Sequence, residues 1–149
     1  MPLLKDRITE DMKSAMRARD AQRLGAIRLL LAAIKQKEVD ERVDVDDASA
    51  LSIVEKLIKQ RKDSIDQFEK ARRMDLVDKE KADLAVLTSY LPQQMSDVEL
   101  AAAIDQAIAE SGATGVQEMG KAMSVLKPRI AGRADMGKAS ALVKQRLAV

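Results

Sequence analysis

The chain has 149 residues and a formal net charge of +2, and 46% of its residues are apolar while 1% are aromatic. It contains neither Cys nor His, which excludes a disulfide framework, a thiolate nucleophile, a histidine general base and a metal site built on either residue. Aliphatic side chains and Met must build the interior, and with few Gly and Pro residues this composition favours packed helices over sheets.

Apolar residues spaced three or four positions apart predict four helices in the first part of the chain. We expect them at residues 3–19, 21–40, 49–73 and 74–91, with an acidic loop at 41–47. The second should be the most buried, because it carries the longest aliphatic stretch, and Asp20 can cap its start. Its core stripe is predicted to be Leu24, Ile27, Leu31 and Ile34, with Leu29, Leu30, Ala32 and Ala33 beside it. In the third, Arg61 stands where the heptad pattern lacks an apolar residue.

The pattern breaks at Pro92, and three shorter helices are predicted beyond it. Ser96 and Glu99 form a capping box for the first of them. We expect the first of the three helices at 97–110, with Gly112 ending it. The second should start after a cap at Thr114 and break or kink at Pro128, and the third should span 136–147 with Asp135 as its cap. The sequence therefore predicts an all-α protein, with an N-terminal helical bundle at 1–91 and a small three-helix C-terminal domain at 92–149.

The last part of the chain is strongly basic. Residues 114–149 hold seven Lys or Arg and two acidic residues, a net charge of +5, so residues 1–113 carry −3. The basic residues are Lys121, Lys127, Arg129, Arg133, Lys138, Lys144 and Arg146. Such an excess predicts a docking surface for a polyanion. Phe68 and Tyr90 are the only aromatic residues, so base stacking lacks a platform, and contact with the phosphates of a folded RNA fits better.

The basic part also contains a repeat. Residues 119–131 recur at 136–148 with seven of 13 positions identical, and each copy starts with Met-Gly-Lys-Ala. One interpretation is that the two helix starts and their lysines bind phosphate groups. The alternative, which we favour, is that each Gly lets two helices approach closely while each Met fills a gap. We expect Lys127, Arg129 and Arg133 to gather in a loop at the proline that breaks the sixth helix.

No reaction centre emerges from the sequence. Ser52, Ser64 and Ser140 lack a neighbouring base that could activate them. Ser140 and Lys144 lie one helical turn apart, but this spacing arises easily by chance. The polar segment at 60–71 is interpreted as a solvated helix face. We therefore predict no catalytic residue, no cofactor site and no metal site.

Two observations bear on location. Lys5 and Asp6 precede any apolar run, which is unlike the start of a signal peptide. The longest aliphatic stretch, at 29–34, is far too short to cross a bilayer. We therefore expect a cytoplasmic protein without a membrane partner, and the oligomeric state stays open.

Several motifs resemble the GatB/YqeY family. They are Tyr-Leu-Pro-Gln-Gln-Met-Ser at 90–96, Met-Gly-Lys at 119–121 and Gly-Arg-Ala-Asp at 132–135, while 28–35 and 60–71 resemble the stand-alone YqeY-like members. The resemblance covers nearly the whole chain and implies an all-helical, two-part fold. It also implies that the last part is similar to the tail domain of the B subunit of the aspartyl/glutamyl-tRNA amidotransferase, a domain that helps to hold the tRNA.

The resemblance thus implies a tRNA-binding accessory protein whose partners are tRNA and an enzyme that handles aminoacyl-tRNA. The positions that match the basic motif of the tail, and so would contact RNA, are Lys121, Lys127, Arg129, Arg133 and Lys138. The kinase core and the amidase machinery of the amidotransferase have no counterpart in this sequence. Two alternatives stay open: an enzyme that transfers an amide to aminoacyl-tRNA with glutamine as donor (a carbon–nitrogen ligase), and a protein–protein adaptor that docks through the helix at 49–73.

Overall fold

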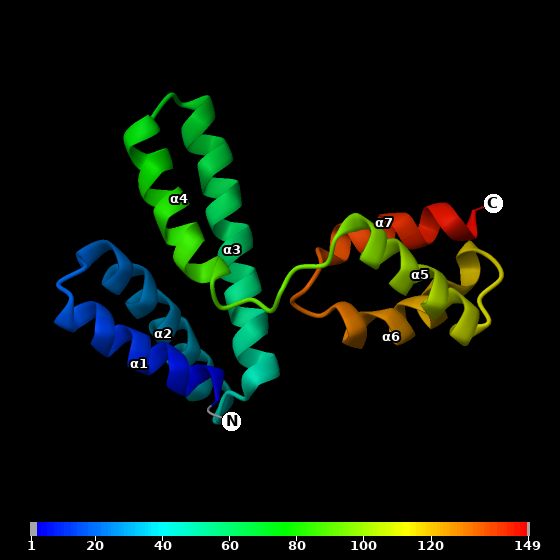
Figure 1. Cartoon of the computed structure of the whole chain (residues 1–149), viewed down its shortest axis with the longest axis horizontal. Helices are drawn as coiled ribbons and strands as arrows, with labels where there is room; N and C mark the ends of the chain where they lie inside the picture. The colour runs from blue at the N-terminus through cyan, green and yellow to red at the C-terminus, as the bar shows by residue number, and fades with distance from the viewer. Residues whose placement is uncertain (1–2, 149) are drawn as a thin grey trace. The chain divides into compact units, whose positions relative to one another are not determined.

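A computed structural model describes residues 3–148, and in this part of the chain it contains seven α-helices, one short 3-10 helix and no strand (Figure 1). The elements are α1 (Leu4–Arg17), α2 (Ala21–Glu41), α3 (Asp47–Lys70), α4 (Met74–Thr88), α5 (Asp97–Ser111), η1 (Val116–Glu118), α6 (Met119–Ile130) and α7 (Met136–Leu147). The prediction of an all-α fold is confirmed.

The chain divides into two compact units, Met1–Leu91 and Pro92–Val149, and each has its own apolar core. In the N-terminal unit α1–α2 and α3–α4 are antiparallel hairpins, and α2 packs against α4 (Figure 1). In the C-terminal unit α5 packs against both α6 and α7. Each core consists almost entirely of aliphatic side chains and Met, as the composition requires.

Capping residues explain where several helices begin and end. The side chains of Asp20, Ser96 and Asp135 each accept a hydrogen bond from the backbone N–H three residues later, which satisfies one of the free donors at a helix start. Gly112 ends α5 in the left-handed conformation, with φ of 72°. All four residues act as the sequence predicts.

Three details differ from the sequence-based expectation. α6 runs through Pro128 to Ile130, because a proline two residues before a helix end removes only one backbone hydrogen bond and its ring lies exposed. The residue expected to cap this helix, Thr114, instead donates from its N–H and its hydroxyl to Glu118, and η1 precedes the helix. In α2 the stripe members Ile27 and Ile34 are buried as predicted, but Leu30 is fully buried in place of the partly buried Leu31, and Leu29 is 40% exposed.

Arg61, which stands where the heptad pattern of α3 lacks an apolar residue, is the centre of a charge cluster. Its Nε lies 3.2 Å from a carboxylate oxygen of Glu80 and 3.9 Å from one of Asp83, both on α4. All three side chains are less than one fifth exposed. Gln22 of α2 donates to Asp83 at 3.1 Å, so the cluster joins three helices.

Tyr90 attaches the last residues of the N-terminal unit to α1. Its ring is buried, its hydroxyl donates to Asp11 at 2.7 Å, and the Arg7 guanidinium lies 5.0 Å from the ring centroid. Burial raises the pKa of Tyr90 above its ordinary value, and the hydrogen bond to Asp11 acts in the same direction. The hydroxyl therefore stays protonated and continues to donate.

The start of the C-terminal unit is fixed by the loop between α6 and α7. Gln94 donates from its side chain to the carbonyl of Gly132 at 2.7 Å, and the Met95 N–H donates to the Arg133 carbonyl at 2.8 Å. Arg133 in turn donates from Nε to the Gln93 carbonyl at 3.1 Å. Residues 93–95 are thus fastened within their own unit.

Replacing Arg61 with alanine should lower the free energy of unfolding by about 2 kcal/mol, because two partly buried carboxylates lose their cation. Urea denaturation of the full chain measures this change. Arg73→Ala is the matched control, since Arg73 pairs with Asp75 on an exposed turn and its loss should change stability little. Equal effects of the two variants would show that the cluster does not hold α3 and α4 together.

Candidate nucleic-acid interface

The five residues expected to contact RNA all lie on the last two helices and the loop between them. Lys121, Lys127 and Arg129 belong to α6, Arg133 to the following loop and Lys138 to the first turn of α7. Lys127 and Arg129 therefore lie on a helix, and the loop expected to gather them with Arg133 does not exist at this position.

Carboxylates of the same unit neutralise four of these five cations. Their ion pairs are Lys121–Glu118 at 2.8 Å, Arg129–Glu110, Arg133–Glu99 at 3.8 Å and Lys138–Asp97 at 2.6 Å, and Arg146 pairs with Asp105. Four of the five acids lie on α5, which precedes the basic segment 114–149. Over residues 92–149 there are seven basic and six acidic residues, a net charge of only +1.

Lys127 and Lys144 are the two basic residues of this unit, within the described chain, that form no ion pair. Both are exposed, and they occupy the same position in the two copies of the repeat. Each lies two residues before an arginine that pairs with α5, namely Arg129 and Arg146. Two residues along an α-helix correspond to a rotation of about 200°, so each lysine points away from α5. The resemblance to the family assigns Lys127, but not Lys144, to RNA contact, although the repeat relates the two positions.

The starts of α6 and α7 already carry carboxylates of the protein. Glu118 accepts from Thr114 and from Lys121 Nζ, and these bonds, led by the one from Lys121, lower the pKa of Glu118 to about 2. Asp135 occupies the equivalent place before α7 and accepts from the Lys138 N–H at 3.0 Å. An added phosphate would meet a negative charge at both helix starts, so the geometry does not favour the phosphate-binding interpretation of the repeat.

The helix-packing interpretation of the repeat is also wrong for its glycines. A Cβ added at Gly120 would meet nothing within 4 Å, and one added at Gly137 would meet the carboxylate of its neighbour Asp135 at 3.5 Å. Neither glycine lies where another helix approaches. The methionines fit the interpretation better, since Met119 and Met136 pack partly buried against the core.

Gly120→Ala should therefore stabilise the protein by about 0.5 kcal/mol, because alanine restricts the unfolded chain and favours helix. Gly112→Ala should instead destabilise it by about 1 kcal/mol, since a φ of 72° disfavours any residue with a Cβ. Thermal unfolding of both variants tests this pair. A loss of stability in Gly120→Ala would reveal a close contact at the start of α6.

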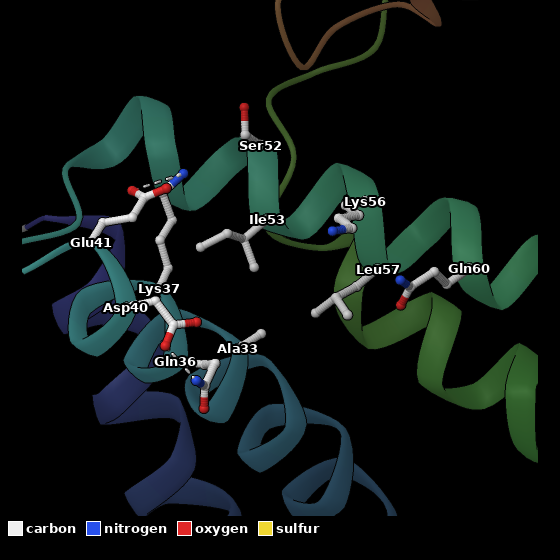
Figure 2. Close-up of a pocket in the computed structure, with 10 residues that line it drawn as sticks. All are labelled: Ala33, Gln36, Lys37, Asp40, Glu41, Ser52, Ile53, Lys56, Leu57 and Gln60. Carbon is white, nitrogen blue, oxygen red and sulfur yellow. Dashed lines mark hydrogen bonds and ion pairs between the residues drawn. The ribbon is translucent and has the colours of Figure 1, made fainter.

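A groove of about 450 Å³ lies between α2 and α3 (Figure 2). Ala33, Ile53 and Leu57 give it an apolar floor, and polar or charged side chains form its rim: Gln36, Lys37, Asp40, Glu41, Ser52, Lys56 and Gln60. Ser52 and Ser140 make no hydrogen bond to a basic side chain in the described residues, and no group of three acidic residues there could hold a metal ion. No helix among them is both long and apolar enough to span a membrane.

Comparison with known proteins identifies the family of this chain. A family model described as "Yqey-like protein" matches residues 5–147. Relatives include the proteins named "Altered inheritance of mitochondria protein 41, mitochondrial" of Lachancea thermotolerans and Eremothecium gossypii. The first is 39% identical over 69% of this chain and 57% of its own length, and the second is 41% identical over 72% and 60%. The corresponding protein of Kluyveromyces lactis is 43% identical over 56% of this chain and 45% of its own length.

These matches correct the expected location and establish the family. The relatives are named as mitochondrial proteins, so the prediction of a cytoplasmic location is wrong. The chain spans only about half to three fifths of the length of these relatives. The match to the family model, by contrast, extends over both helical units. The chain belongs to the YqeY-like family.

Proposed function

We propose that this protein is a tRNA-binding accessory factor that contacts the phosphate backbone and carries out no chemistry of its own. The observation that supports the proposal is the pair of lysines at equivalent places in the repeat, Lys127 and Lys144. Both are exposed, neither is paired with an acid in the described chain, and both point away from the acidic side of α5. Two such cations on adjacent helices suit contact with a folded RNA that is read by shape.

The ion pairs around Lys127 and Lys144 determine which other cations can contact RNA phosphates. Surface pairs contribute little to stability, so a phosphate can replace Glu110 as the partner of Arg129 at small cost, whereas Lys121 and Lys138 stand at helix starts that already carry a carboxylate. The α5 carboxylates remain nearby, however, and repel the backbone on their own side. RNA binding is therefore centred on the outer faces of α6 and α7. Arg133 is poorly placed for the role because its guanidinium holds the carbonyl of Gln93.

The double variant Lys127→Glu/Lys144→Glu should lose roughly tenfold or more in affinity for total tRNA at low salt, and the salt dependence of binding should become shallower. Fluorescence anisotropy of labelled tRNA across a salt gradient measures both quantities. Lys56→Glu/Lys62→Glu on α3 makes the same change in net charge and serves as the control. If the two double variants bind alike, the proposed interface on α6 and α7 does not exist.

The groove between α2 and α3 favours a second candidate function, the docking of a partner protein. Its apolar floor and charged rim suit the apolar face of an amphipathic helix. Ile53→Glu places a charge on that floor and should abolish a protein contact that withstands ribonuclease and high salt. A pull-down that compares this variant with the native chain decides the question, since equal recovery of the partner would exclude the groove.

A further inference from the structure

Three arginines of the N-terminal unit occupy a backbone conformation that normally belongs to glycine. Arg19, Arg42 and Arg72 have φ of 56°, 54° and 57° and follow the ends of α1, α2 and α3. In each case the N–H of the next residue donates to the carbonyl five positions earlier, the helix-ending motif in which glycine is preferred. The C-terminal unit has Gly112 and Gly132 at its left-handed positions.

Charge gives a local reason for one of these arginines. Arg42 lies within residues 38–47, where six acidic residues and no other basic residue stand in ten positions. A cation in that segment reduces repulsion between the neighbouring carboxylates. Arg42 therefore compensates for its backbone conformation within the fold itself.

Arg19 and Arg72 have no such reason. Both are exposed and lack an ion pair among the described residues, as do their neighbours Arg17 and Lys70. A cation at a helix C-terminus does interact with the helix dipole, but Arg17 and Lys70 already supply that charge in the last turns of α1 and α3.

The two residues lie at corresponding places in the fold. Arg19 is in the turn that joins α1 to α2, and Arg72 is in the turn that joins α3 to α4 (Figure 1). Both turns are at the ends of the hairpins remote from the acidic segment 38–47, of which residues 42–46 join α2 to α3 (Figure 1). The N-terminal unit therefore has an acidic end and two hairpin tips that present unpaired cations.

We propose that these two hairpin tips bind phosphate groups of the same RNA that the C-terminal unit contacts, an inference that rests on the function proposed above. At each tip a guanidinium and a second cation, Arg19 with Arg17 and Arg72 with Lys70, provide the donors. A guanidinium offers two parallel hydrogen bonds to one phosphate, which a glycine cannot replace. The left-handed arginines then serve ligand binding at the expense of backbone stability.

The test is the double variant Arg19→Gly/Arg72→Gly in the full chain. It should raise the midpoint of thermal unfolding, measured at high salt to screen the helix dipole, and should lower affinity for total tRNA. We expect a loss of roughly tenfold at low salt and a decrease of about two in the slope of log affinity against log salt. Arg42→Gly is the matched control: the same substitution in the same conformation should leave tRNA affinity unchanged.

Each outcome has a clear meaning. Weaker binding together with a higher melting temperature supports the proposal. Native affinity in Arg19→Gly/Arg72→Gly, alongside a loss in Lys127→Glu/Lys144→Glu, overturns the hairpin-tip contact and leaves the proposed function intact. A native chain that does not bind tRNA overturns both. Binding to vesicles of phosphatidylcholine and phosphatidylserine that this variant abolishes, with tRNA affinity unaffected, assigns the tips to a membrane and also overturns the proposal.

Discussion

Carboxylates along α5 pair with cations of α6, α7 and their connecting loop, and this pairing determines what the C-terminal unit presents to its surroundings. Asp97, Glu99, Asp105 and Glu110 each hold one basic side chain. Each pair is exposed and weak by itself. The apolar core fixes which side of the two later helices faces α5, the ion pairs neutralise the cations along that side, and the opposite sides keep their unpaired lysines. A segment that is strongly basic in the sequence thus becomes a nearly neutral unit with a small cationic face.

Local features of the fold could be predicted because local interactions determine them. Helix boundaries followed apolar spacing and side-chain caps, and α7 begins and ends where the sequence indicates. Asp20, Ser96, Gly112 and Asp135 act within a few residues of their own positions, so no tertiary information was needed. The course of α6 through Pro128 was missed because it depends on how close the proline lies to the end of the helix.

The candidate site was less predictable, because charge pairing is a tertiary property. Nothing in the sequence of α6 indicates that Glu110 will hold Arg129, since 19 positions separate them. The glycines of the repeat gave no usable signal either, as open space around Gly120 is visible only in three dimensions. The repeat places Lys144 at the same position as Lys127, so the sequence already supports an RNA contact for both. In α3 the missing apolar residue did signal a special position, and the structure explains it by the two carboxylates around Arg61.

The connection between the two units is very short. Tyr90 is tied to Asp11 in the first unit, whereas the side chain and backbone of residues 93–95 are tied to the loop after α6 in the second. Only Leu91 and Pro92 separate these two attachments along the chain. For the RNA that we propose as ligand, a tether of this length would make contact by the second unit an intramolecular step once the first unit has bound. Under the proposed function, the few exposed cations of each unit would then reach together an affinity that neither set reaches alone.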